Sequence, residues 1–326
     1  MVDPRIVAAI REFLDRSDRV LVATHVQPDG DAVSSLLATG LALEALDISH
    51  DLVCDDKPPL RFNFLPNADR ILTSAPDDVT HDLLIALDAA DLERLGRAYT
   101  DLGRPKPPII NIDHHVTNPD YGEVNFVDGQ ASSTTELLHH LLPLLGVDIS
   151  SDIAKCLLAG LVTDTLNFST SSVSSNTLRA AASLIDAGAD LFNVSSKSYK
   201  LQQLSTLMLW QVGLKNMRLE ERLLWTTISN EEKHAAGHTG SSSFGLGNFM
   251  SDVYQAAMSA VLVELDDGSV TVGFRCRPPY DVAEIATALG GGGHRLAAGC
   301  TINGPLDDAE KLVVRQSKIA LRKQRA

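Results

Sequence analysis

One short segment of the chain gathers a histidine and two carboxylates within seven residues. It reads HVQPDGD over residues 25–31 and ends the apolar run RVLVATH. Pro28 and Gly30 favour a turn, which would bring His25, Asp29 and Asp31 toward one point. A second interpretation is a polar strand-to-helix loop in which Asp31 caps the next helix. Taken alone, the segment fits a ligand site and a capped loop equally well.

Three further acidic or histidine clusters each follow an apolar run. Asp88 ends DLLIALD, the triplet Asp113-His114-His115 ends PPIINI, and Asp164 lies in GLVTDT after a buried helical stretch. Asp88 alone would be an ordinary loop carboxylate. In an open parallel sheet, however, ligands gather at the carboxyl ends of the strands. We therefore expect these side chains to meet in one crevice with the histidine segment.

The ligand types in these clusters indicate which ions they would hold. Oxygen and imidazole ligands without thiolates suit Mn²⁺ best, with Mg²⁺ or Co²⁺ as alternatives. The four cysteines are scattered and contain no CxxC pair, so a thiolate zinc site is not indicated. Two ions about 4 Å apart can share a carboxylate and activate a water for attack on phosphorus. The candidate ligands are His25, Asp29, Asp31, Asp88, His114 and Asp164.

The elements that must position these residues predict an α/β fold in two domains. In the first half, continuous apolar runs alternate with helical segments, which is typical of a parallel sheet covered on both faces. Ser133 and Glu136 have the spacing of a capping box and would open a helix. From about residue 219, three strand-like runs appear, the last two joined by the turn signal DDGS at 266–269. We predict a metal-binding domain at 1–195, a helical connector at 196–218 and a smaller domain at 219–326.

Composition and charge limit the partners. The chain has 326 residues, 44% of them apolar, and a net charge of −14 from 28 basic and 42 acidic side chains. Such a balance disfavours long nucleic acid, because tight binding to a polymer usually needs a basic stripe. No apolar run approaches the roughly 18 residues that span a bilayer. We expect a cytoplasmic protein with no membrane partner and a short phosphorylated substrate.

Four motifs together resemble the DHH phosphoesterase superfamily: HVQPDGDA, the strand end at Asp88, the DHH triplet and GLVTDT. The later segment GFRCRPPYDVAEIATALGGGGHRLAAG resembles the DHHA1 substrate-binding domain of the same superfamily. The resemblance covers nearly the whole chain and is strongest to the nano-RNase and pAp phosphatase group. It implies a Rossmann-like first domain, a DHHA1 second domain, and a homodimer as one oligomeric option.

The resemblance also implies roles for individual residues. It places one metal ion on His25, Asp29 and Asp88. It places a second ion on Asp31, Asp88, His114 and Asp164, with Asp88 bridging the two. His115 resembles the histidine that faces the scissile phosphate as a general acid or charge stabiliser. Asp113 resembles a partner that orients a histidine.

A glycine run in the second domain is a candidate phosphate-binding loop. Glycines let backbone N–H groups approach an anion closely, which here concerns Gly291, Gly292 and Gly293. His294 and Arg275 could add charge-assisted hydrogen bonds to a terminal phosphate. The alternative is a flexible turn after a helix, in which the first glycine is a C-cap.

These features together predict a metal-dependent phosphohydrolase. We expect it to release nucleoside 5′-monophosphates from short 5′-phosphorylated RNA such as pApA, and the resemblance implies removal of the 3′-phosphate of pAp. One domain would hold the metals and the other the far phosphate. A cyclic-dinucleotide phosphodiesterase is the closest alternative. A non-catalytic nucleotide sensor would have lost at least one ligand, and all six are present.

Overall fold

The computed structural model describes residues 2–76, 78–200, 203–238 and 245–324. The chain divides into two compact units, Met1–Leu201 and Gln202–Ala326. The expected connector at 196–218 is split between them: the short helix η5 (Ser196–Lys200) belongs to the first unit, and α8 (Leu204–Lys215) belongs to the second.

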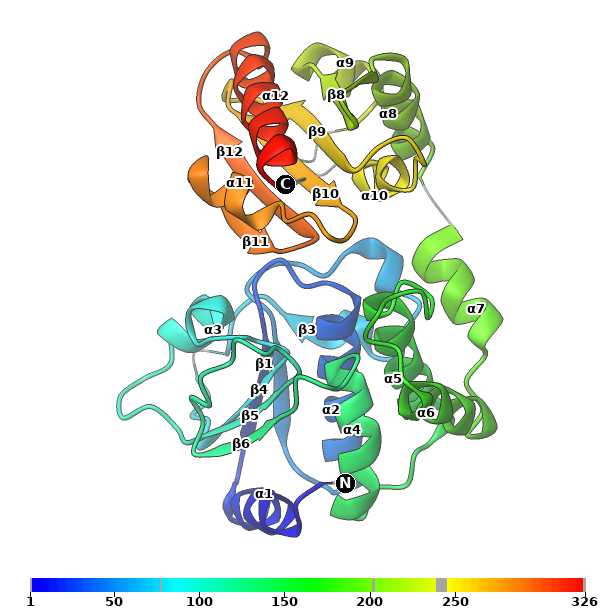
Figure 1. The fold of residues 1–326 in the computed structure, drawn as a ribbon. Helices are drawn as coiled ribbons and strands as arrows, with labels where there is room; N and C mark the ends of the chain where they lie inside the picture. The colour runs from blue at the N-terminus through cyan, green and yellow to red at the C-terminus, as the bar shows by residue number, and fades with distance from the viewer. Residues whose placement is uncertain (1, 77, 201–202, 239–244, 325–326) are drawn as a thin grey trace. The chain divides into compact units, whose positions relative to one another are not determined.

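The first unit is built on a six-stranded sheet in which every neighbouring pair is parallel. The strand order is β3-β2-β1-β4-β5-β6. The strands are β1 (Val20–Thr24), β2 (His50–Val53), β3 (Ile71–Leu72), β4 (Leu83–Leu87), β5 (Ile109–Asp113) and β6 (Val124–Val127). This order reverses between β1 and β4, so the doubly wound topology places its switch point there (Figure 1). Ligands of such sheets bind outside the carboxyl ends of the strands at that point.

Both faces of this sheet are covered, but unequally. Alternate strand residues such as Val22 and Ile85 face a large core, while Leu21 and Leu84 face a smaller one. The large core is closed by helices: α1 (Pro4–Arg16), α2 (Gly30–Ala45), α4 (Thr134–Leu141), α5 (Ser151–Asp164), α6 (Ser175–Asp186) and α7 (Leu191–Ser195). The smaller core is closed by the single turn η3 (Glu93–Leu95) and the four-residue α3 (Arg97–Thr100).

The start of α4 differs from the predicted capping box. The Ser133 hydroxyl accepts a hydrogen bond from the Glu136 backbone, as a cap requires. The Glu136 carboxylate does not return to Ser133; it accepts from the backbone and hydroxyl of Ser132 and from the Thr177 hydroxyl of α6. The buried glutamate therefore fixes the start of α4 against α6.

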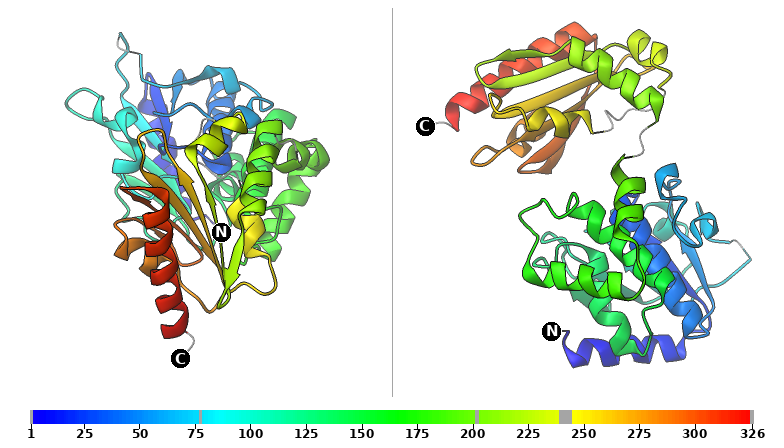
Figure 2. Two further views of the ribbon diagram at one scale, coloured as in Figure 1. Left: turned by 90° about the horizontal axis from the view of Figure 1, so that it is seen from above. Right: turned by 90° about the vertical axis from the view of Figure 1, so that its right-hand side faces the viewer.

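The second unit is a mixed six-stranded sheet with helices on both faces (Figure 2). The strands are β7 (Arg218–Glu220), β8 (Leu223–Ile228), β9 (Met258–Glu264), β10 (Val270–Cys276), β11 (Gly292–His294) and β12 (Ala297–Ile302), in the order β11-β12-β10-β9-β8-β7. Among the strand pairs that the structure describes in this unit, β8–β9 is parallel and the others are antiparallel. Helices α11 (Ala283–Ala288) and α12 (Leu306–Lys323) cover one face, and α8 and α10 (Leu246–Ser251) cover the other.

The short α9 (Asn230–Ala235) follows β8 in the same unit. None of the helices within the described ranges is long and apolar enough to cross a lipid bilayer.

Three of the four glycines in the run have a structural reason to be glycine. Gly290 has φ +81 and ends α11 as a left-handed C-cap residue. A Cβ on Gly291 would collide with the Gly299 carbonyl of β12, and one on Gly293 would lie 2.6 Å from the Cα of Ala298. Gly292 has neither reason: no positive φ requires glycine there, and no atom lies within 4 Å of a Cβ placed on it. Close pairing of β11 on β12 therefore explains most of the run.

Candidate metal centre

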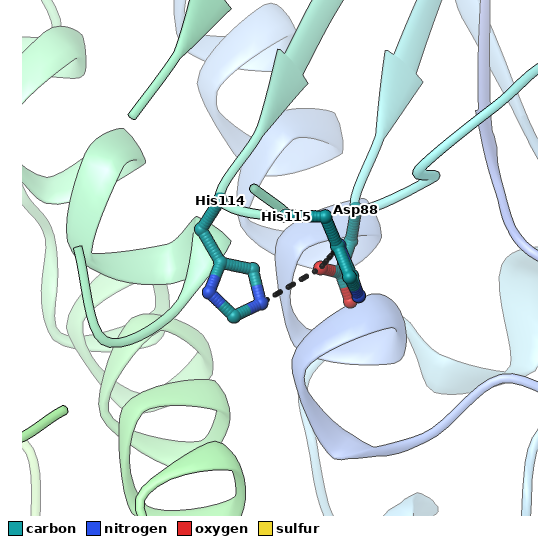
Figure 3. Close-up of side chains that lie close together, drawn as sticks. All are labelled: Asp88, His114 and His115. Carbon is teal, nitrogen blue, oxygen red and sulfur yellow. Dashed lines mark ion pairs between the residues drawn. The ribbon is translucent and has the colours of Figure 1, made fainter. Parts of the chain in front are cut away.

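The carboxyl ends of three neighbouring strands deliver the central residues of the site. His25 follows β1, Asp88 follows β4, and His114 and His115 follow β5. Figure 3 shows Asp88 directed toward both histidines of the β5 loop. The side chains of His25 and Asp88 are almost fully buried. The parallel sheet thus converts widely separated sequence positions into one cluster.

Asp88 lies between two histidines, one for each of its oxygens. The His25 Nε2 atom is 3.7 Å from Asp88 Oδ2 and 3.8 Å from Asp29 Oδ1. The His114 Nε2 atom is 3.5 Å from Asp88 Oδ1 and 3.5 Å from Asp164 Oδ2. Two groups of ligand atoms, each within 4.8 Å, result: His25, Asp29 and Asp88; and Asp31, His114 and Asp164. All six candidate ligands therefore lie together, with Asp88 in contact with both groups.

A backbone carbonyl fixes the tautomer of His25, one of the two candidate ligand histidines. The Nδ1 atom of His25 lies 2.7 Å from the Val26 carbonyl, which can only accept, so Nδ1 carries the proton. Arg94 Nη2 is also 3.3 Å from this Nδ1, but two donors cannot pair, and the shorter contact decides. The Nε2 lone pair of His25 is thus left for a cation, the arrangement typical of metal-binding histidines. His114 likewise presents its Nε2 to the carboxylates, at 3.5 Å from both Asp88 and Asp164.

Two threonines that the sequence patterns did not single out hold the carboxylates in place. Asp31 accepts hydrogen bonds from the Thr134 backbone at 2.6 Å and from the Thr135 hydroxyl at 2.7 Å. The Thr134 hydroxyl donates to Asp88 Oδ1 at 2.9 Å. The sequence SSTTE at 132–136 could have indicated these two threonines, because its hydroxyls lie beside the first backbone N–H groups of a helix.

His115 lies beside the cluster but is engaged differently. Its Nδ1 atom is 2.7 Å from Asp113 Oδ1 and 3.7 Å from Asp88 Oδ1. A group of Asp88, His114 and His115 has ligand atoms close enough for a cation. The shorter contact to Asp113, however, requires a proton on Nδ1, so the His115 nitrogen that faces Asp88 has no lone pair for a metal ion, and only Nε2 keeps one. Asp113 is fully buried, and although desolvation raises its pKa, the hydrogen bonds of His115 and Asn118 hold that pKa below its ordinary value.

Crowding of the carboxylates changes their acidity in the direction that favours a cation. Burial, with the charges of Asp31 and Asp29, raises the pKa of Asp88 well above its ordinary value. Burial and the charge of Asp31 raise the pKa of Asp164 to about 7. Burial also raises the pKa of Asp31. The chain has gathered carboxylates whose mutual repulsion a divalent ion would relieve, so the residues present fit metal ions.

These shifts predict how the metal-free protein responds to pH. A carboxyl whose pKa is raised by folding loses its contribution to stability as pH rises toward the folded value. For Asp164 that window runs from about 4, its unfolded pKa, to about 7. The pKa of His114 is raised too, although burial acts to lower it, because the charges of Asp31 and Asp164 outweigh burial, and its effect has the same sign. Carboxyls whose pKa is lowered by folding, such as Asp113, titrate below this pH range.

We therefore expect the chelator-treated protein to melt several degrees higher at pH 5.5 than at pH 7.5. One pKa unit is about 1.4 kcal/mol, and about 1 kcal/mol moves Tm by roughly 2–4 °C at this domain size. Differential scanning fluorimetry across this range measures the slope, and Asp164→Asn should flatten it. A Tm that rises with pH would contradict the assignment.

The second unit carries the other predicted site residues. Arg275 on β10 is half-buried; its Nε donates to Asn248 Oδ1 at 2.7 Å and its Nη1 to the Phe274 carbonyl at 2.8 Å. Burial lowers its pKa, and among the described residues no carboxylate forms an ion pair with it. His294 lies exposed in β11, paired with Ala297 of β12. A partly desolvated guanidinium without an acidic partner is suited to an anionic ligand.

Comparisons with known proteins agree with this arrangement. Residues 19–161 match the model of the DHH family, N-terminal domain, and residues 229–318 match the DHHA1 domain. The chain is 31% identical to a bifunctional oligoribonuclease and PAP phosphatase of Thermus thermophilus over 95% of this chain and 92% of that one. It is 26% identical to a protein of the same name from Bacillus subtilis, over 91% and 93%.

A crystal structure of an exopolyphosphatase-related protein from Bacteroides fragilis has the same fold. The TM-score is 0.93 at 23% sequence identity, covering 100% of this chain and 99% of the other.

Proposed function

Because the chain belongs to the DHH phosphoesterase family, with its DHH and DHHA1 domains in that order, we propose that it hydrolyses short 5′-phosphorylated oligoribonucleotides. The products are nucleoside 5′-monophosphates, and the 3′-phosphate of pAp is removed at the same site. The observation that carries the proposal is Asp88, whose two oxygens face two separate histidines. Relatives named oligoribonuclease and PAP phosphatase that align over nearly the whole chain support the substrate class.

The metal ions are part of the proposal. His25, Asp29 and Asp88 would hold one divalent ion, and Asp31, Asp88, His114 and Asp164 would hold a second. Mn²⁺ is the preferred ion, because Mg²⁺ favours all-oxygen shells and each group includes an imidazole. When bound, such ions lower the pKa of a water and neutralise charge on phosphoryl oxygens.

The chain itself supplies the proton for the leaving group. Asp113 binds the Nδ1–H of His115 and so fixes the orientation of the ring. The free Nε2 atom can then carry a proton toward the departing oxygen of the scissile phosphate. His115 therefore acts as the general acid in this proposal.

Arg275 is proposed to bind a phosphate of the substrate. Gly292 and His294, on the strand that lies on the other side of β12 from Arg275, are proposed as further phosphate contacts. A charge-assisted hydrogen bond contributes about 1.5–3 kcal/mol, so we expect Arg275→Met to raise KM for pApA about 10–100-fold. Metal affinity should be unchanged. Arg315→Met on the exposed side of α12 is the matched control. Unchanged KM in the Arg275 variant would remove this residue from the site.

The experiment that tests the function is product analysis on pApA with Mn²⁺ before and after chelation. Release of AMP that disappears with EDTA and returns with Mn²⁺ supports the proposal. A series of longer 5′-phosphorylated RNAs tests the length limit, and turnover should fall with length because the chain carries a net charge of −14. No AMP from a folded, metal-bound protein would overturn the proposal. Cyclic dinucleotides are then the next substrates to test.

A further inference from the structure

We infer that Asn118 is a positioning residue that sets the orientation of His115 and ties it to the loop of Asp88. Asn118 lies three residues after His115, half-buried behind the loop. None of the sequence motifs above includes it. The kinetic part of this inference rests on the proposed function; the structural part does not.

The first contact runs through Asp113, each of whose oxygens has a different partner. Asp113 Oδ1 accepts from His115 Nδ1 at 2.7 Å. Asp113 Oδ2 accepts from Asn118 Nδ2 at 2.7 Å. A carboxylate that is hydrogen-bonded through just one of its oxygens can rotate about its Cβ–Cγ bond. With Asn118 on the second oxygen, the carboxylate plane and therefore the imidazole plane are fixed.

The second contact reaches the neighbouring strand. Asn118 Nδ2 also lies 3.3 Å from the carbonyl of Ala89, the residue that follows Asp88. The Tyr121 hydroxyl donates to the same carbonyl at 2.9 Å. Asp88 has φ +56, a backbone conformation that is costly for a residue with a Cβ and persists only where its surroundings enforce it. Asn118 and Tyr121 are two of the groups that enforce it.

The orientation of the Asn118 amide is determined by its other partners. Its Oδ1 accepts from Asn111 Nδ2 at 2.9 Å and from the Asp120 backbone N–H at 2.9 Å. Both partners are donors, so the oxygen must face them and the NH₂ group must face Asp113. Asn111 is fully buried in β5 and also donates to Asn125 Oδ1 at 2.9 Å. A chain of amides thus runs from the sheet interior to the catalytic loop.

The competing explanation is purely structural: the amides satisfy one another because Asn111 is buried. Asn125 separates the two explanations. It shares the bond to Asn111, but its remaining bonds go to the backbone of Gly122 and not to Asp113 or Ala89. Asn125→Ala therefore removes a member of the amide chain without touching the link to His115.

The test compares Asn118→Ala and Asn118→Asp with Asn125→Ala in the full-length, Mn²⁺-loaded protein. Loss of an orienting partner typically costs about 10–100-fold in activity. We expect kcat for pApA to fall by this factor in both Asn118 variants, with KM changed less than about threefold. In the protein loaded with diamagnetic Mg²⁺ instead of Mn²⁺, the His115 Nδ1–H signal in ¹H–¹⁵N spectra should shift or broaden. Asn125→Ala should keep kcat within about threefold and keep the signal, even if its Tm falls.

Two results would overturn the inference. One is an Asn118→Ala variant with wild-type kcat and an unchanged His115 signal. The other is that kcat falls equally in the Asn118 and Asn125 variants, in proportion to their loss in Tm. If wild type does not hydrolyse pApA, the proposed function fails, and the His115 signal still decides the positioning role. If the alanine variant does not fold, Asn118→Asp keeps the size and removes the donor, so its spectrum gives the answer.

Discussion

Replacing Asp88 with asparagine should abolish hydrolysis of pApA while the fold is retained. Each Asp88 oxygen faces a different candidate ligand histidine, so the side chain would serve both proposed groups of ligands. A metal Lewis acid supplies several kcal/mol to phosphoryl chemistry, and each 1.4 kcal/mol is a factor of ten. We expect kcat/KM to fall by at least ~10³-fold. Isothermal titration with Mn²⁺ should show weakened binding at both groups.

The same substitution should stabilise the metal-free protein. Asparagine has the size of aspartate and tolerates the left-handed backbone better than most residues, so φ +56 is accommodated. It also removes a charge from a cluster in which burial and neighbouring carboxylates raise the pKa of Asp88. Tm of the chelator-treated Asp88→Asn protein at pH 7.5 should therefore exceed that of wild type.

Asp120→Asn is the matched control for this substitution. Asp120 also has φ +56, but it is exposed and lies outside the ligand groups. It should keep wild-type activity and Tm. An active Asp88→Asn enzyme, or equal losses in both variants, would contradict the bridging role of Asp88.

The strands that carry the site could be predicted because each is a continuous apolar run. β1, β4 and β5 are buried on both faces, and the polar residue after each run marks the strand end. β3 and β6 could not be found in this way. β3 has two residues, and β6 (VNFV) alternates buried and half-buried side chains at the edge of the sheet. Edge strands lack the double burial that makes the central runs apolar.

The candidate ligands could be proposed from sequence because acids and histidines at strand ends share one sheet edge. The groups that orient them could not, because a hydroxyl or amide acquires such a role only through tertiary contacts. Thr134 lies 103 residues from Asp31, to which its N–H donates. The glycine run has a second explanation that the sequence did not show: the end of α11 and the close approach to β12 account for three of its four glycines, whereas the predicted phosphate contact stays a prediction.

The adjacent histidines of the DHH triplet should respond differently to alanine substitution. His115→Ala should lower kcat for pApA about 10²–10⁴-fold, the range for loss of a general acid. Mn²⁺ stoichiometry and affinity should stay close to wild type, because the His115 nitrogen that faces Asp88 is Nδ1, whose proton is donated to Asp113. His114→Ala should instead weaken Mn²⁺ binding, since its Nε2 faces both Asp88 and Asp164. Titration calorimetry and steady-state kinetics on the same samples separate the two effects.

The comparison of the two alanine variants decides whether His115 is a general acid or a metal ligand. His115 Nδ1 is 3.7 Å from Asp88 Oδ1, close to the 3.5 Å of His114 Nε2 from the same oxygen, so distance to Asp88 does not distinguish an acid from a ligand. The nitrogen that faces Asp88 does distinguish them: His114 presents Nε2, whereas His115 presents Nδ1, whose proton is donated to Asp113. If His115→Ala lost one Mn²⁺ per chain, His115 would be a metal ligand through Nε2 and not the general acid. If only kcat falls, His115 lies outside the metal shell, and its Nε2, oriented by the Asp113 hydrogen bond, is the atom that meets the leaving group.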